Sequence, residues 1–66
     1  MNKIRNIRKK NNLTIKQLSE QSGVPYRTIQ GWERGERLPR DVYQIHKVAK
    51  TLNVLIEELI DFEEEN

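Results

Sequence analysis

The chain has 66 residues, no cysteine and a formal net charge of +2, with 33% of its residues charged. This length allows one small domain with a modest core, and the lack of thiols excludes disulfides and thiolate zinc sites. His46 is the single histidine and cannot build a metal site by itself, so we expect no metal and no cofactor. No apolar run is long enough for a signal peptide or a membrane span. We therefore expect one cytoplasmic domain that is stabilised by helix packing.

The charges are divided unevenly along the chain. Residues 1–50 hold all 12 Lys and Arg against 4 acids, a balance of +8, whereas residues 51–66 hold 6 acids and no base, a balance of −6. A basic body attracts phosphates whatever the base sequence, although such charges can equally form a solvated surface. We place the domain at residues 1–62 and expect residues 63–66 to be a frayed acidic tail that lies away from phosphates.

The first predicted elements are two helices, at about residues 3–10 and 15–22. Thr14 carries a hydroxyl that can cap a helix start, and Gln17 follows three residues later as the reciprocal half of a capping box. Two asparagines, one of them left-handed, end the first helix. Gly23 adopts positive φ without steric cost, so it ends the second helix and makes a tight turn.

A third helix is predicted over residues 25–34, directly after this turn. Pro25 has a fixed φ and no N–H, which suits a first helical turn, and Gly35 supplies the stop. Apolar Ile29 and Trp32 recur at helical spacing and point inward. Two short helices around a tight turn form the layout that offers a helix to the DNA major groove. The candidates for contact with the groove on the outward side of this helix are Tyr26, Arg27, Gln30 and Gly31, with Thr28 near its edge.

Two more helices complete the predicted fold. Asp41 is a good N-cap for the fourth, and Asn53 is its expected stop. The apolar residues of the fourth helix are spaced as one inward stripe, and Tyr43 and His46 fall on its solvent side. The sequence therefore predicts an all-α domain of five helices, with no competing strand signal. The stripe consists of Val42, Ile45, Val48, Ala49 and Leu52, and the inner face of the fifth helix consists of Ile56, Leu59 and Ile60.

Ordered sequence motifs connect residues 4–60 with a known family. They are IRNIR at residues 4–8, LT at 13–14, SGV at 22–24, WERGE-R-LP at 32–39 and V-AKTLNV at 48–54. Each motif alone is weak, but the set at these spacings is strong. On these residues the chain resembles the Cro and phage-repressor DNA-binding domains, also called the xenobiotic-response-element type of helix-turn-helix. The resemblance implies a lambda-repressor-like fold of five helices.

The resemblance and the chemistry of the side chains together indicate how DNA would be contacted. Arg offers a planar fork to guanine O6 and N7, and Gln can pair in the same way with adenine N6 and N7. Arg27 is the first choice for base reading, and Tyr26 matches a family position that often reads bases. The helix start at Thr14, Ile15 and Lys16 presents backbone amides that suit a phosphate. The full base-reading set is Tyr26, Arg27, Thr28, Gln30 and Gly31, and Arg34, Arg37 and Arg40 would add phosphate contacts.

Other positions have structural roles or depart from the family pattern. Arg8 and Glu33 resemble a family pair that joins the first helix to the third, and breaking such a pair costs about 3 kcal/mol. Ile15 stands where the family has a phosphate-binding Gln, so that side-chain contact is expected to be missing. Gly31 stands where relatives carry a base-reading side chain, so either readout is lost there or the backbone approaches DNA closely. Leu55 replaces a polar N-cap.

The leading functional hypothesis is a sequence-specific double-stranded DNA-binding regulator of transcription. We expect a small Cro-like repressor, of bacterial or phage origin, that binds an inverted-repeat operator as a homodimer. Leu55 and Phe62 are candidates for the dimer contact, or they pack within one chain. No small-molecule ligand, membrane contact or enzymatic activity is expected. The alternative is a protein-interaction module or antitoxin component that uses the same fold, with Ile15, Leu55 and Phe62 as contact points.

Overall fold

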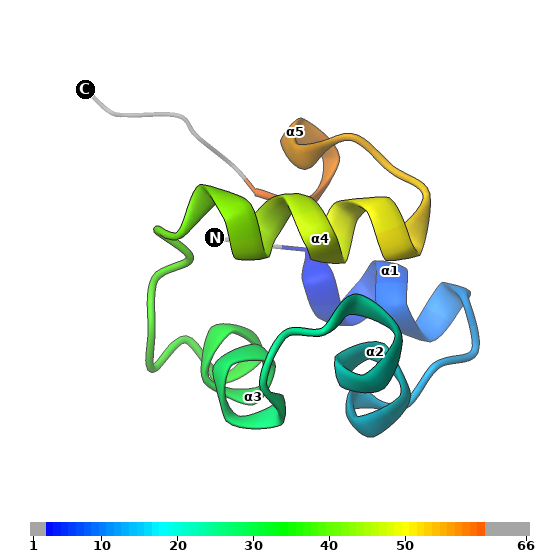
Figure 1. Ribbon diagram of the computed structural model, residues 1–66, viewed down its shortest axis with the longest axis horizontal. Coiled ribbons are helices and arrows are strands. Elements are labelled where there is room, and N and C mark those ends of the chain that lie inside the picture. The colour runs from blue at the N-terminus through cyan, green and yellow to red at the C-terminus, as the bar shows by residue number, and fades with distance from the viewer. Residues whose placement is uncertain (1–2, 61–66) are drawn as a thin grey trace.

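The computed structural model describes residues 3–60, which fold into five helices, so the predicted five-helix all-α fold is confirmed. The helices are α1 (Ile4–Lys10), α2 (Ile15–Ser22), α3 (Tyr26–Arg34), α4 (Val42–Leu52) and α5 (Ile56–Leu59). α4 runs across the middle of the molecule, with α2 and α3 on one side and α5 on the other (Figure 1). Phe62 and the acidic tail predicted at residues 63–66 lie outside the described residues.

The helix boundaries follow the capping residues. The hydroxyl of Thr14 accepts a hydrogen bond of 3.0 Å from the Gln17 amide, and the Thr14 amide donates one of 2.9 Å to Gln17 Oε1, which completes the predicted capping box. Gly23 and Gly35 end α2 and α3 at φ values of 80° and 77°. The prediction that Pro25 is the first residue of α3 is wrong by one position: its ψ of 141° is not helical, so Pro25 is the N-cap and α3 begins at Tyr26.

Two side-chain hydrogen bonds fix the turn between α2 and α3. Ser19 Oγ donates to the Val24 carbonyl at 2.6 Å, and the Val24 amide donates to Ser22 Oγ at 3.2 Å. Val24 is itself buried in the core, so the turn is anchored by packing as well as by hydrogen bonds. Both constraints limit how α3 can rotate relative to α2, and they thereby hold the outward side of α3 in place.

The core contains the apolar residues that helical spacing predicts, with one exception. Trp32 from α3 and Leu18 from α2 belong to the same buried cluster as the inner face of α4. Val42 was predicted to continue the α4 stripe but is 65% exposed, because it opens the helix beside a loop whose residues are themselves exposed. The buried apolar residues are Ile4, Leu18, Val24, Ile29, Trp32, Ile45, Val48, Ala49, Leu52, Leu59 and Ile60.

An ion pair joins α1 to the end of α3. Arg8 Nε lies 2.7 Å from Glu33 Oε2, and Arg8 Nη2 lies 2.9 Å from Glu33 Oε1, so the contact is bidentate. Arg8 Nη1 also donates to the Leu13 carbonyl at 2.8 Å. The side chains of Arg8 and Glu33 are only 10% and 6% exposed. The hydrogen bond to Glu33 raises the pKa of Arg8 above its ordinary value despite the burial, so the guanidinium remains charged.

Candidate nucleic-acid interface

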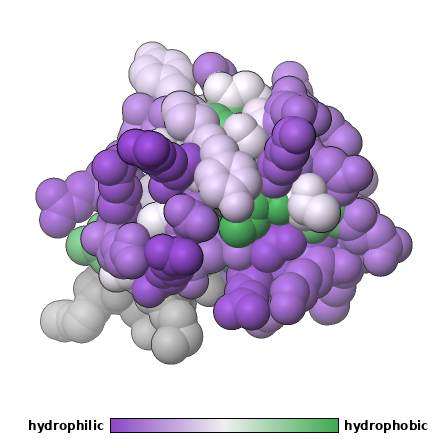
Figure 2. Space-filling view, turned by 90° about the horizontal axis from the view of Figure 1, so that it is seen from below, coloured by the Kyte–Doolittle hydropathy of each residue, from purple (hydrophilic) through white to green (hydrophobic). Residues whose placement is uncertain are grey.

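The first half of α3 presents polar side chains on the surface. Tyr26 is 45% exposed and Arg27 is also exposed, whereas Thr28 and Gln30 are half-buried. Ile29 and Trp32 point into the core and hold this helix against the domain. The side of the molecule that carries α2 and α3 is covered mostly by hydrophilic side chains, around a small hydrophobic area (Figure 2). A helix that is anchored on one side and polar on the other can enter a groove without losing core contacts.

Gly31 shares a stripe of α3 with Arg27, as helical spacing predicts, but it is not open to solvent as we expected. The residue is buried, and the side chain of Arg37 covers it. The positive φ of Gly35 turns the chain back toward α3, where the amides of Glu36 and Arg37 donate to the Gly31 carbonyl at 2.9 and 3.2 Å. Helical periodicity alone assigns Gly31 to the outward stripe, and it cannot foresee a loop that folds back over the helix.

The start of α2 offers backbone amides to an anion. The capping box uses the amides of Thr14 and Gln17, and the amides of Ile15 and Lys16 have no partner within the helix because they belong to its first turn. Lys16 is exposed and adds a positive charge, while Ile15 is half-buried and packs against the core. The helix dipole favours negative charge at this end, so the geometry suits a phosphate oxygen.

The three arginines predicted to contact phosphate at the end of α3 and in the loop after it are all exposed. Arg34 Nη1 lies 3.7 Å from Glu36 Oε2, and both side chains are about equally open to solvent. An exposed pair of this length is worth little free energy, so Arg34 can exchange it for a phosphate. Arg40 lies in the loop before α4, and Arg37 lies over α3. These residues place positive charge on the C-terminal side of α3.

Arg5 is a basic residue near this surface that our sequence analysis did not include. It lies three residues before Arg8, so both side chains share one face of α1. The sequence could have indicated this placement: Arg8 was predicted to pair with Glu33 on α3, and a residue three positions earlier on the same face of α1 should lie near α3 as well. Arg5 lines a shallow hollow between α1, α2 and α3 together with the half-buried Ile15. Ile15 is the residue that stands where the family has a phosphate-binding Gln. The hollow is lined by Arg5, Arg8, Ile15, Gln30, Glu33 and Arg34.

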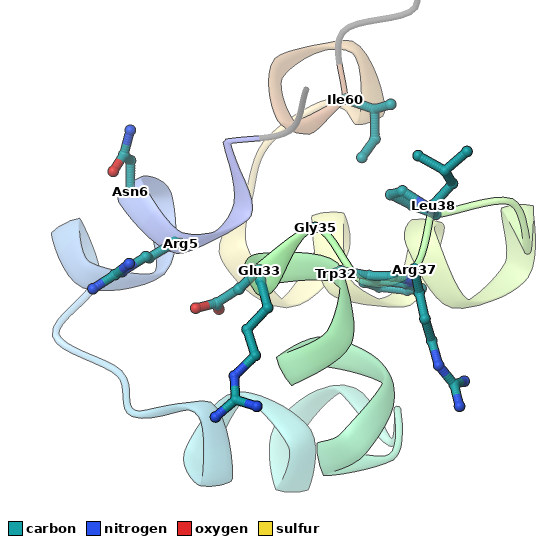
Figure 3. A pocket seen from close by; sticks show the side chains of 10 residues that line it. Arg5, Asn6, Trp32, Glu33, Gly35, Arg37, Leu38 and Ile60 are labelled. Carbon is teal, nitrogen blue, oxygen red and sulfur yellow. The ribbon is translucent and has the colours of Figure 1, made fainter.

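A second and larger pocket lies between α1, the end of α3 and the loop that follows α3. It has a volume of about 400 Å³ and combines an apolar wall with basic residues at its rim (Figure 3). Trp32, Leu38 and Ile60 contribute to the apolar wall, and Arg5 and Arg37 contribute to the basic rim. Among the described residues, no group of three His, Cys, Asp or Glu side chains could hold a metal ion. None of the described helices is long and apolar enough to cross a membrane.

A capped helix, a glycine turn and a second helix with one polar face, all within five helices, define a helix-turn-helix domain of the DNA-binding class. A family model described as helix-turn-helix matches residues 4–59 of the chain. The chain belongs to this family, the Cro and phage-repressor type of helix-turn-helix, whose domains are DNA-binding regulators and are not typically enzymes. No curated protein matches the sequence.

Proposed function

We propose that this protein is a sequence-specific regulator of transcription that reads double-stranded DNA with the first half of α3. The observation that carries the proposal is the exposed Arg27 near the start of a helix whose opposite side is buried. Arg is the side chain best suited to guanine in the major groove. Tyr26, Thr28 and Gln30 extend the same surface toward neighbouring bases.

Phosphate contacts on either side of α3 would fix its register in the groove. The amides of Ile15 and Lys16 would bind a phosphate at the start of α2, and Arg34 at the end of α3 and Arg40 in the following loop would add positive charge. Such contacts orient the protein but carry no sequence information. Each neutralised phosphate is expected to contribute about 0.9 to the slope of log affinity against log salt.

We propose further that the protein acts as a dimeric repressor on an inverted repeat that overlaps a promoter. One recognition helix reads only a few base pairs, and a two-fold dimer doubles them on half-sites about 34 Å apart. Leu55 supports a dimer contact at α5, because this leucine is 64% exposed and offers no side-chain cap to the helix. A protein-interaction role is the rival use of the same exposed leucine.

The proposal is tested by selection from a random duplex library with purified protein at near-physiological salt, followed by sequencing of the bound pool. An enriched inverted repeat is the expected result. A single short site would retain specific reading but overturn the dimer, and an unenriched pool would contradict specific reading. In that last case, co-purification of a tightly bound partner protein would favour the interaction module.

Replacing Leu55 with Asp tests the dimer contact. Leu55→Asp is expected to weaken dimerisation at least tenfold in sedimentation equilibrium, because it places a charge in an apolar contact, and tenfold corresponds to about 1.4 kcal/mol. Asp also caps α5, which is worth about 1 kcal/mol, so the variant should not be less stable as a monomer. Val42→Asp is the matched control, since Val42 is 65% exposed at the start of α4. Equal dimerisation in both variants would contradict a contact at Leu55.

A further inference from the structure

The side chain of Arg37 covers the glycine inside α3. A Cβ atom built at Gly31 would lie 3.1 Å from Arg37 Cδ, 3.2 Å from Cγ and 3.6 Å from Cβ. All three of these neighbours belong to Arg37. The Gly31 carbonyl also accepts a hydrogen bond from the Arg37 amide. The aliphatic part of Arg37 therefore occupies the space that a side chain at residue 31 would take. A Cβ at residue 31 would require Arg37 to move by a few tenths of an ångström, and a longer side chain would require more.

The charged end of Arg37 points out of this contact. The residue is exposed as a whole, although its aliphatic part packs on Gly31. Its side chain extends beside α3, away from Leu38 and Ile60 (Figure 3). Within residues 3–60, the recorded ion pairs are Arg8 with Glu33 and Arg34 with Glu36, so the guanidinium of Arg37 is not held by a carboxylate there. The aliphatic part of Arg37 is therefore held against α3, while its guanidinium is available to bind a ligand.

The contact at Gly31 places Arg37 one helical turn from Arg27. The two helix positions, 27 and 31, are four residues apart and lie on one stripe of α3. One turn advances about 5.4 Å, which exceeds the base-pair rise of about 3.4 Å. A guanidinium extended from residue 31 can therefore reach a different base pair from the one that Arg27 reaches.

We propose that Arg37 is a base-reading residue, and that it supplies from the loop the side chain that Gly31 lacks. Its ligand would be guanine O6 and N7 in the major groove, which a planar guanidinium binds with two hydrogen bonds. Gly31 is then a positioning residue that admits the loop arginine to the helix surface. This inference rests on the proposed function, and it replaces the sequence-based expectation that Arg37 contacts only phosphate.

Arg37→Lys separates the two roles because it keeps the charge and removes the fork. The affinities of the wild-type protein and the variant are compared on the selected duplex and on duplexes with each base pair of the half-site changed. Base reading predicts that Arg37→Ala loses roughly 5- to 150-fold of discrimination at one G·C pair, and that the lysine variant, which can still contact guanine but lacks the fork, loses part of it with an unchanged salt slope. A phosphate contact predicts that lysine keeps all preferences, while Arg37→Ala weakens every duplex equally and lowers the salt slope by about 0.9. That second pattern would overturn the inference.

Gly31→Ala tests the positioning role, with thermal unfolding as its folding control. Ala is favoured over Gly inside a helix, so the fold should not lose stability from propensity, but the new Cβ requires Arg37 to shift by a few tenths of an ångström at Cγ and Cδ. We expect reduced discrimination at the same G·C pair in the wild-type background and no further loss in the Arg37→Ala background. An equal effect in both backgrounds would contradict coupling through Arg37. If the wild-type protein discriminates between no sequences, the proposed function fails as well; if it does and Arg37→Lys changes nothing, this inference alone fails.

Discussion

Glu33→Ala is expected to lower the free energy of unfolding by about 3 kcal/mol, measured by urea denaturation at neutral pH. The change leaves the buried guanidinium of Arg8 with the Leu13 carbonyl as its remaining recorded partner. The variant also loses the hydrogen bond that raises the pKa of Arg8, but a guanidinium stays protonated at neutral pH, so Arg8 cannot escape this cost by losing its proton. In the wild-type protein, the raised pKa of Arg8 means that the stabilisation from its protonated form is present throughout the neutral range and is lost as the pH rises into strong alkali.

Two further variants separate the ion pair from general effects of removing a carboxylate. Glu36→Ala removes the acid of the exposed pair with Arg34 and is expected to cost no more than about 0.5 kcal/mol. The double variant Arg8→Met with Glu33→Leu is expected to recover most of the loss, since apolar residues of similar size often replace a buried pair without cost. A loss in Glu33→Ala no larger than that in Glu36→Ala would show that the pair does not hold α1 to α3.

Arg27→Ala is expected to abolish discrimination at one base pair of the half-site, a loss of roughly 1–3 kcal/mol on the selected duplex. The fold should be unaffected to within about 0.5 kcal/mol, because Arg27 is an exposed residue outside the recorded ion pairs. Affinity for unrelated duplexes should fall much less than affinity for the selected one. The measurement is fluorescence anisotropy on a panel of single-base-pair variants of the duplex.

Arg40→Ala and Lys47→Ala are the matched controls for Arg27→Ala. Arg40 lies in the loop near α3, where a phosphate contact predicts uniform weakening and a salt slope lower by about 0.9. Lys47 lies on the exposed face of α4, where the same loss of charge should change little. If Arg27→Ala keeps every base preference, the reading surface lies elsewhere on the molecule.

Local chemistry was sufficient to predict most of the fold. Thr14 with Gln17, and the glycines at 23 and 35, set the ends of α2 and α3 through capping and positive φ, which depend on neighbouring residues alone. Helical spacing also identified the buried apolar residues of α3 and all four buried residues of α4, but it wrongly added Val42 to the latter. Val42 was misplaced because periodicity gives a direction around the helix axis, whereas burial also requires another element at that level.

The candidate interface was less predictable, because part of it depends on how the loop returns to the helix. Arg27 could be predicted as a base-reading candidate from its position on α3 and from the chemistry of its guanidinium. The contact between Gly31 and Arg37 could not be predicted in this way. The five positions between them include the turn at Gly35, and helical spacing does not determine the path of the chain through that turn. Arg5 was missed for a related reason, since its nearness to Ile15 depends on how α1 packs against α2 and α3.

The central claim is that DNA binds the face formed by the start of α2, the first half of α3 and the loop at residues 36–40. Titration of isotope-labelled protein with the selected duplex, or with a mixed-sequence duplex at low salt, tests this claim through amide chemical shifts. We predict that the largest changes occur at Lys16, Arg27 and Arg37 and the smallest at Tyr43 and Lys47 on the exposed face of α4. Changes concentrated on α4 or around Leu55, with α3 unaffected, would contradict it.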